Sequence, residues 1–464
     1  MSFFENPLRG FTGRASLTSG AFVIALLLGS IAGLTTSAVH ASSTVAPAPS
    51  VSKLQKELRS ALVAKQTNTA LGVVDQLADI GSKKAMDAIV GLAFRADAPD
   101  VERGTILRLR ELPRESEAIE RLSELVTKHK DYRVRAGLLW VMEARHEPAA
   151  MTAVVQSLYD RMPSVVLAAL EVLAKKDQLN TVEHLIAALE NQEEQGRRDA
   201  LLAFEIRKTL TSITNLNFEY AADWQNYWRV HGEEFQRPPK KERGEKATSV
   251  KRDPPRFFGI EVNTDRLVFV LDVSGSMERK DPLPEEDGSE AGKRGGTSVG
   301  PKKVKPKPTQ DEIPESRRRL TRVKKELITV INRLPKETMF NIITFNHLIG
   351  EFEKKLVRAT PNNKKKAIAF INEFKPEGQT HTDDALAKAF EFEQIDTIFL
   401  LSDGAPRRND KLMETKPILD TVRTWNRFRR VRINAVTFEQ CGANLRRFMR
   451  LLASKNNGGY KELR

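Results

Sequence analysis

Three oxygen-bearing side chains stand on alternate residues of one short segment. Asp272, Ser274 and Ser276 occur in the run L-D-V-S-G-S-M at residues 271–277. Hard oxygen donors at this spacing suit a small hard cation, Mg²⁺ or Mn²⁺, better than Zn²⁺, which takes nitrogen and sulfur ligands. The single cysteine, Cys441, excludes an intrachain disulfide and a cysteine-rich metal site. The segment therefore predicts a metal site made of carboxylate and hydroxyl groups.

The predicted metal site follows a strand. Residues 267–271 are consecutive apolar residues without polar alternation, which is typical of a strand buried on both faces of a parallel sheet. Ligands of open α/β sheets bind at the carboxyl ends of such strands. A second apolar strand, 396–402, is followed by Asp403, and a loop before another helix carries Thr380. We expect both residues to join the first three at one edge of the sheet.

This arrangement of five oxygen-bearing residues resembles the von Willebrand factor type A domain (VWA domain) and its metal-ion-dependent adhesion site. The resemblance implies that Ser274, Ser276 and Thr380 contact the metal directly. It also implies that Asp272 and Asp403 often act through water. The expected cofactor is Mg²⁺ or Mn²⁺, with one coordination position open for a partner.

The same resemblance implies a doubly wound, Rossmann-like α/β fold for residues 263–464. Regular alternation of strands and helices from residue 338 onward predicts this fold independently. The family expectation at the threonine loop is Gly-Gly-Thr, whereas this chain has Gly378-Gln379-Thr380. The glutamine can change the backbone of the loop but leaves the hydroxyl in place.

The segment 278–318 is an insertion between the serine loop and the next predicted helix. It begins acidic, passes through glycines and ends in a lysine-rich run, a composition that cannot form a core. We expect it to be disordered and to emerge at the metal edge. Its acidic part, residues 285–287, could compete with a partner as a tethered inhibitor. A solvated loop without effect is the favoured alternative.

Residues 1–41 have the features of a signal peptide. Two arginines precede a short apolar run at 21–28, and small residues precede the expected cleavage after Ala41. Residues 42–50 follow as a flexible mature N-terminus. The alternative is an uncleaved membrane anchor, because 16–39 holds no charged residue and is long enough to span a bilayer. Either interpretation predicts an exported protein, periplasmic or secreted.

Helical periodicity runs through residues 51–232 and predicts an all-α domain. Segments that begin at Asp100, Arg133 and Ser164 align with one another at offsets of 31 to 33 residues. This pattern is similar to a HEAT-type solenoid, in which helix pairs bury their apolar faces against their neighbours. The aromatic stretch 216–228 is expected to cap the solenoid. A carbohydrate or peptide platform is the alternative for that stretch.

Residues 233–262 are rich in Pro, Lys and Arg and predict an extended linker. The whole chain of 464 residues carries a net charge of +14. Such an excess can attract an anionic envelope surface. Acidic residues interleave the basic runs, however, and favour simple solvation. No specific nucleic-acid partner is indicated.

The motifs favour binding over catalysis. Gly-x-Ser-x-Gly, His-Glu-x-x-His and P-loop sequences do not occur, and His381 is the one histidine expected near the metal. We therefore predict a non-enzymatic adhesion or assembly module whose metal captures an exposed Asp or Glu of a partner protein. The helical repeats would offer a second protein-binding surface. A metal-independent scaffold that acts through the repeats is one alternative, and a metal-assisted hydrolase is another.

Overall fold

The structure is a computed structural model that describes residues 49–94, 98–114, 116–239, 253–282, 309–409 and 411–464. Residues from Pro49 to Arg464 form one compact unit. The predicted signal peptide, most of the predicted flexible N-terminus and residues 283–308 of the predicted insertion lie outside the described residues. Among the described helices, none is long and apolar enough to cross a membrane.

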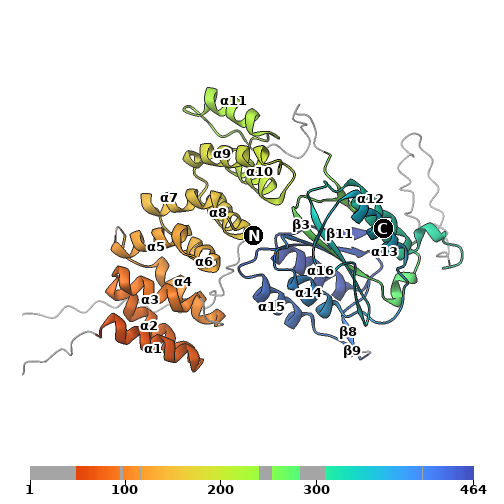
Figure 1. Cartoon of the computed structure of the whole chain (residues 1–464), viewed down its shortest axis with the longest axis horizontal. Helices are drawn as coiled ribbons and strands as arrows, with labels where there is room; N and C mark the ends of the chain where they lie inside the picture. The colour runs from red at the N-terminus through yellow and green to blue at the C-terminus, as the bar shows by residue number, and fades with distance from the viewer. Residues whose placement is uncertain (1–48, 95–97, 115, 240–252, 283–308, 410) are drawn as a thin grey trace, which may run out of the picture. The chain divides into compact units, whose positions relative to one another are not determined.

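A helical solenoid forms the N-terminal part of the described chain (Figure 1). Its helices are α1 (Val51–Val63), α2 (Thr67–Ile80), α3 (Lys83–Ala93), α4 (Pro99–Arg110), α5 (Glu117–Lys128), α6 (Tyr132–Glu143), α7 (Pro148–Gln156), α8 (Pro163–Lys176), α9 (Val182–Glu194), α10 (Leu201–Thr214) and α11 (Ala221–His231). Helices α2, α4, α6, α8 and α10 contact one another in succession and form one layer, while α1, α3, α5 and α7 contact one another in the second. The predicted helical solenoid is confirmed.

Two glycines mark equivalent positions of the sequence repeat. A Cβ at Gly104 of α4 would lie 2.5 Å from the side chain of Leu71, and a Cβ at Gly137 of α6 would lie 2.5 Å from that of Phe94. An apolar side chain of an earlier helix pair thus packs directly on the helix backbone. The two glycines are equivalent in the sequence repeat, whereas their packing partners are Leu71, within α2, and Phe94, directly after α3.

The aromatic stretch closes the C-terminal end of the solenoid. Trp224 of α11 is fully buried, and its indole Nε1 donates to the carbonyl of Phe218 at 3.1 Å. The two rings meet edge to face at 5.0 Å, and Trp228 packs on Phe235 at the same distance. Rings with so little exposure act as core, so the structure favours a cap over an open binding platform.

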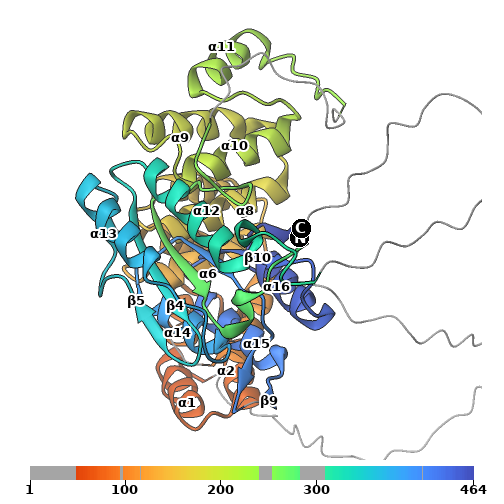
Figure 2. The ribbon, with the colours of Figure 1, turned by 90° about the vertical axis from the view of Figure 1, so that its right-hand side faces the viewer.

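A seven-stranded sheet forms the centre of the C-terminal part (Figure 2). Its strands are β3 (Arg266–Asp272), β4 (Met339–Phe345), β5 (Ile349–Glu351), β6 (Val357–Arg358), β7 (Thr397–Leu401), β10 (Arg432–Phe438) and β11 (Tyr460–Leu463). The order is β11-β10-β7-β3-β4-β5, and β6 also pairs with β4. Strands β5 and β6 run antiparallel to β4, whereas the other neighbours are parallel.

The strand order reverses at β3, because β4 pairs on one side of it and β7 on the other. The helices of this part are α12 (Arg319–Arg333), α13 (Pro361–Asn372), α14 (Thr382–Glu391), α15 (Thr415–Asn426) and α16 (Ala443–Lys455). Helix α14 contacts β3 and β4, and every residue of β3 after Arg266 is buried. The predicted doubly wound fold is confirmed. Ligands of such sheets bind at the carboxyl ends of the strands beside the reversal.

The predicted linker 233–262 contains ordered structure. Strands β1 (Arg256–Phe257) and β2 (Ile260–Glu261) form an antiparallel hairpin. Phe257 is fully buried, and its ring packs on Phe269 of β3 at 5.3 Å and on Phe399 of β7 at 5.8 Å. The α/β domain therefore begins before this hairpin, because the hairpin supplies an aromatic ring to the core of the sheet. A short strand pair β8 (Arg407–Arg408) and β9 (Lys411–Leu412) precedes α15.

Both ends of the insertion 278–318, predicted to be disordered, are ordered. The 3-10 helix η3 (Gly275–Glu278) ends at the first residue of the insertion, and the 3-10 helix η4 (Glu315–Arg317) lies near its last residue. Lys280 and Arg318 form an antiparallel bridge that joins the two ends. The prediction was wrong at these ends because charge pairs, backbone hydrogen bonds and the buried side chain of Ile313 hold them.

Residues 427–432, which we call the arginine turn, connect α15 to the start of β10 and contact the solenoid through three arginines. Each pairs with a glutamate from a different helix of one layer: Arg427 with Glu102 of α4, Arg430 with Glu171 of α8, and Arg432 with Glu205 of α10. Phe428 stacks on Trp140 of α6 at 6.5 Å, and Arg430 lies over the same indole at 5.5 Å. These contacts lie at the amino end of β10, whereas Asp272 ends β3 at the opposite edge of the sheet.

We expect Arg430→Glu to separate the helical and α/β parts, because it places like charges at a partly buried contact with Glu171. Small-angle scattering of the full chain should then show a larger radius of gyration. The double variant Arg430→Glu/Glu171→Arg should restore the wild-type radius in part. Arg423→Glu, at an exposed position of α15, is the matched control. An unchanged radius in Arg430→Glu would contradict the contact.

A half-buried carboxylate lies at the amino end of the sheet. Asp396 precedes β7 and accepts hydrogen bonds from the amides of Asp265 and Arg266, both at 3.0 Å, and from the hydroxyl of Thr264. Burial raises the pKa of Asp396 to about 6, while the Thr264 hydrogen bond opposes this shift and the charge of Asp265 adds to it. The carboxylate ties the start of β3 to the start of β7.

This raised pKa predicts a pH-dependent stability. The pKa of Asp396 in the folded chain lies above the ordinary value of 3.8, so the protonated carboxyl group stabilises the fold. This contribution to the free energy of unfolding is complete below pH 3.8 and is lost as the pH rises through about 6. Relative to Asp396→Asn, the wild-type free energy of unfolding should fall by about 2–3 kcal/mol between roughly pH 4 and pH 7. Urea denaturation measures it, with Asp420→Asn as an exposed control. Parallel pH profiles for wild type and Asp396→Asn would refute the assignment.

Candidate metal and ligand-binding site

Asp272 is the last residue of β3, and its side chain is fully buried. Its Oδ1 accepts a hydrogen bond from the amide of Ser274 at 2.8 Å. Its Oδ2 accepts one from the hydroxyl of Ser402 at 2.6 Å. The carboxylate therefore fixes the loop after β3 against the loop after β7.

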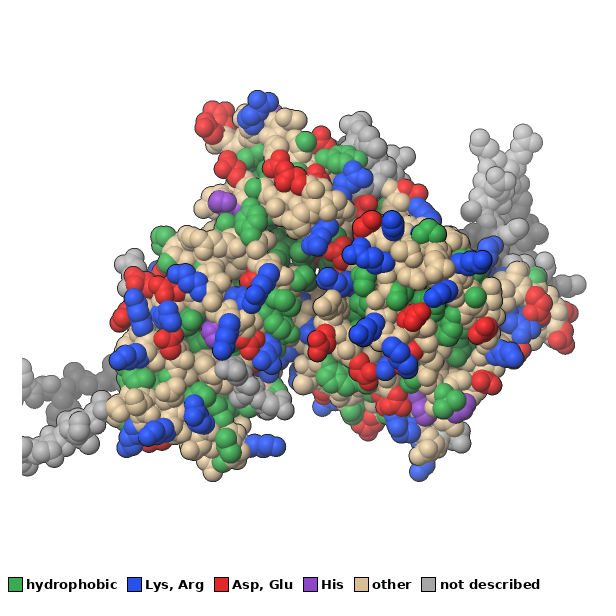
Figure 3. Space-filling view, in the orientation of Figure 1, with side chains coloured by type: hydrophobic (Ala, Val, Ile, Leu, Met, Phe, Trp, Pro, Cys, Tyr) green, Lys and Arg blue, Asp and Glu red, His purple; other side chains and the backbone are tan. Residues whose placement is uncertain are grey.

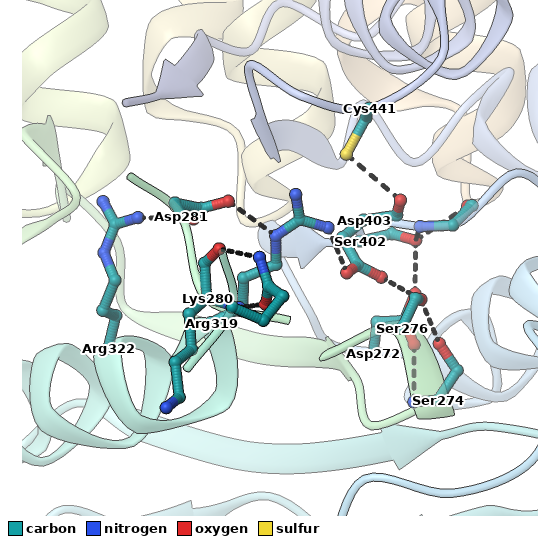
Figure 4. A network of polar contacts seen from close by, with 12 residues as sticks. Asp272, Ser274, Ser276, Lys280, Asp281, Arg319, Arg322, Ser402, Asp403 and Cys441 are labelled. Carbon is teal, nitrogen blue, oxygen red and sulfur yellow. Dashed lines mark hydrogen bonds and ion pairs between the residues drawn. The ribbon is translucent and has the colours of Figure 1, made fainter. Parts of the chain in front are cut away.

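The two serines of the loop after β3 lie close to one another and to Asp403 (Figure 4). Ser274 Oγ lies 3.1 Å from Ser276 Oγ, and the Ser276 hydroxyl donates to Asp403 Oδ1 at 2.5 Å. Oxygen ligands lie 2.0–2.1 Å from Mg²⁺, so neighbouring ligands of an octahedron lie about 3 Å apart. The serine pair already has this spacing.

Thr380 reaches the same edge of the sheet through the loop before α14. The amide of Gly275 donates to the carbonyl of Gly378 at 3.1 Å, which holds the threonine loop beside the serine loop. A Cβ at Gly404 would lie 2.6 Å from Thr380 Oγ1, so only glycine allows this close approach. The φ of Gly378 is +72°, so this glycine supplies the left-handed conformation and Gln379 does not have to.

Asp272 has no positively charged partner among its described contacts, which are a hydroxyl and an amide donor. Burial raises the pKa of Asp272 to about 7, the charge of Asp403 adds to this shift, and hydrogen bonds from two serines oppose it. An ionised carboxylate in a protein interior is stabilised by an opposite charge. A divalent cation at the serine pair would supply that charge.

The structure adds a guanidinium to the site. Arg319, the first residue of α12, is 2% exposed; its Nη1 donates to Asp403 Oδ2 at 2.7 Å and its Nε to Asp281 Oδ1 at 2.9 Å. Arg322 donates to the other oxygen of Asp281 at 2.7 Å. The buried Cys441 thiol donates to the carbonyl of Asp403 at 3.1 Å. Asp403 thus lies between the serine pair and a buried cationic side chain (Figure 4).

Other titratable groups near this edge are paired. Arg408 donates to both Asp383 and Asp384 at 2.8 Å. His381 Nδ1 lies 3.5 Å from Asp384, and a second histidine, His347, lies against the threonine loop, where only one histidine was expected. In the part of the chain that the structure describes, no group of three or more His, Cys, Asp or Glu side chains could hold a metal. A cation here would therefore depend on hydroxyl oxygens.

Four of the five predicted site residues form one connected set of hydrogen bonds: Asp272, Ser274, Ser276 and Asp403. Thr380 lies beside this set. Sequence reasoning missed Ser402 and Arg319. The serine directly precedes Asp403, so its place at the strand end was a usable signal. The arginine follows the insertion, and no spacing rule connects it to the metal motif.

Residues 314–461 match the family described as von Willebrand factor type A domain. The chain is 27% identical over 143 residues to human von Willebrand factor A domain-containing protein 3A, covering 30% of this chain and 12% of that protein. It is also 27% identical over 143 residues to human von Willebrand factor A domain-containing protein 3B, covering 31% of this chain and 10% of that protein. The chain thus spans a small part of the length of these relatives.

Solved structures with similarity include a von Willebrand factor type A protein from Catenulispora acidiphila, at 16% identity and a TM-score of 0.30, covering 43% of this chain and 38% of that one. Another is the conserved hypothetical protein BatB from Bacteroides thetaiotaomicron, at 12% identity and a TM-score of 0.29, covering 43% of this chain and 89% of that one. The family match includes Thr380 and Asp403 but begins after the serine loop. Residues 314–461, within the C-terminal part of this chain, are therefore identified as a von Willebrand factor type A domain.

Proposed function

We propose that this chain is a protein-interaction module in which the VWA domain binds Mg²⁺ or Mn²⁺ and captures an Asp or Glu of a partner protein. The cation would lie at the oxygen cluster, defined as Asp272, Ser274, Ser276, Thr380 and Asp403. The observation that carries the proposal is the hydrogen-bonded set at the strand reversal, with two hydroxyl oxygens 3.1 Å apart. The three hydroxyls would contact the cation, and the two carboxylates would act through water.

A bound cation would supply one open coordination position for a carboxylate oxygen of the partner. Hydroxyl ligands carry no charge, so the cation keeps its attraction for an acidic side chain. Gly275 is exposed and Ser276 is half-buried, so a partner can reach the serine loop from solvent. Binding, rather than catalysis, is the role proposed for this edge of the sheet.

The helical repeats would supply a second protein-binding surface. The layer with α4, α8 and α10 contacts the arginine turn, so we place this surface on the layer with α1, α3, α5 and α7. Basic and acidic side chains are interspersed over the face shown in Figure 3, which gives no support to a specific nucleic-acid partner. A metal-independent scaffold that acts through the repeats is the alternative function, because the solenoid is complete without the metal site.

The double variant Ser274→Ala/Ser276→Ala tests the metal site. It removes two hydroxyl oxygens, while Asp272 keeps the hydroxyl of Ser402 and a backbone amide as partners. We expect the Mn²⁺ affinity measured by calorimetry to fall at least about tenfold, which is about 1.4 kcal/mol. The melting temperature should stay within a few degrees of wild type. Ser454→Ala, at an exposed serine of α16, is the matched control.

Equal Mn²⁺ affinity in the wild type and the double serine variant would contradict the metal site. Capture of partner proteins from the native envelope, with and without EDTA, then separates the two functions. Partners lost with EDTA and lost in the serine variant support metal-dependent capture. Partners retained under both conditions support the scaffold instead.

We also propose that the chain is exported, on the strength of the apolar segment and small residues within 1–41. N-terminal sequencing of the native protein should then begin at residue 42, directly after Ala41. A native chain that starts at Met1 and stays in the membrane fraction would support the uncleaved anchor. A full-length native chain in the cytosol would contradict export altogether.

A further inference from the structure

Arg319 connects the oxygen cluster with the ordered start of the insertion through its side chain. One side of its guanidinium donates to Asp403, which belongs to the oxygen cluster. The other side donates to Asp281, which lies in the ordered start of the insertion. The side chain is 2% exposed, and its guanidinium lies 4.9 Å from the centre of the Phe438 ring. Burial and stacking hold this guanidinium in one position, so its two ion pairs form a fixed bridge.

Asp281 belongs to a small structure that we call the stem, made of residues 279–282 and 309–319. Its two strands are joined by backbone hydrogen bonds from Asp281 to Arg317 at 3.1 Å and from Arg319 to Arg279 at 2.9 Å. The side-chain amide of Gln310 pairs with both backbone groups of Lys280, at 2.8 and 3.0 Å. The stem is therefore an ordered element that directly follows the serine loop, where the amide of Arg279 donates to the carbonyl of Ser276 at 3.1 Å, and its side-chain contact with Asp403 is made by Arg319.

The two oxygens of the Asp403 carboxylate have different partners. Its Oδ1 faces the hydroxyl of Ser276, and its Oδ2 faces the guanidinium of Arg319. A divalent cation at the serine pair would bring a second positive charge beside that guanidinium. Like charges in a poorly solvated site repel strongly, because the interior screens them far less than water does. Cation binding and the Arg319–Asp403 ion pair therefore oppose one another.

We propose that Arg319 is a positioning residue that couples the oxygen cluster to the stem, so that a bound cation loosens the stem and an intact stem weakens cation binding. This inference rests on the proposed metal site. It concerns a residue outside the five family positions. Coupling between two sites is reciprocal, so the factor by which the stem weakens cation binding equals the factor by which the cation loosens the stem.

The test uses the full chain with Mn²⁺ as the probe and two readouts. Calorimetry gives the Mn²⁺ affinity of the wild type and Arg319→Gln, and we expect the variant to bind at least about tenfold more tightly. Hydrogen exchange of the stem amides, followed by mass spectrometry, gives the second readout. In the wild type, saturating Mn²⁺ should speed this exchange by a similar factor. In Arg319→Gln, exchange should be fast with and without Mn²⁺.

Arg318→Gln is the matched control. Arg318 lies in the stem and pairs with Glu278 and Glu315, so the variant also removes an arginine of the stem. Arg318 is not a partner of Asp403 in the described contacts, so its loss should change the Mn²⁺ affinity less than twofold. Ser276→Ala is a second control, in which Mn²⁺ should no longer change the exchange of the stem.

The outcomes separate this inference from the proposed function. If the wild type and Arg319→Gln bind Mn²⁺ equally and the stem exchanges at one rate throughout, the coupling is refuted and the metal site stands. If neither protein binds Mn²⁺, both are refuted. If only Arg319→Gln binds, the coupling stands in its strongest form, and the metal dependence proposed for the native chain is refuted. If Arg319→Gln does not fold, the stem exchange of the wild type with and without Mn²⁺ decides the matter.

Discussion

A carboxylate buried at the end of a doubly covered strand is the constraint around which the VWA domain is arranged. Strand β3 is buried on both faces, so its last residue, Asp272, enters the interior with its charge. Burying a carboxylate is costly unless hydrogen bonds or an opposite charge compensate it. The amide of Ser274 and the hydroxyl of Ser402 provide the hydrogen bonds, and in doing so they join the loops after β3 and β7. The geometry that stabilises one buried group thus also brings the hydroxyls of the site together.

The balance of charge at this edge follows from the same constraint. Asp403 forms an ion pair with Arg319, which also pairs with Asp281. Asp272 instead accepts hydrogen bonds from neutral donors. A cation at the serine pair would therefore offset the charge of ionised Asp272, whose pKa burial raises. The solenoid contacts the opposite edge of the sheet through the turn before β10. This arrangement keeps the oxygen cluster and the solenoid contact at opposite ends of the strands, so each can be changed without directly removing the other.

Much of this site followed from simple rules about strands. The apolar run before Asp272 and the one before Asp403 each indicated a buried strand, and parallel strands bring their carboxyl ends to one edge. The same rules did not predict residues whose local sequence is charged or rich in proline. Phe257 stands in a proline-rich basic stretch, so nothing marked it as part of the core, although it packs on rings of β3 and β7. Arg319 was missed because a long charged insertion separates it from the motif, and only the folded chain shows that its guanidinium reaches Asp403.

Anomalous X-ray diffraction from crystals grown with Mn²⁺ tests most directly whether the oxygen cluster binds a cation. If the cluster binds a cation, we expect a single strong manganese peak within about 2.0–2.4 Å of the Ser274 and Ser276 hydroxyl oxygens, beside Thr380 and Asp403. Soaking the same crystals in EDTA should remove this peak. A map with no peak at the serine pair in crystals that hold Mn²⁺ elsewhere, with Arg319 still paired to Asp403, would contradict the account.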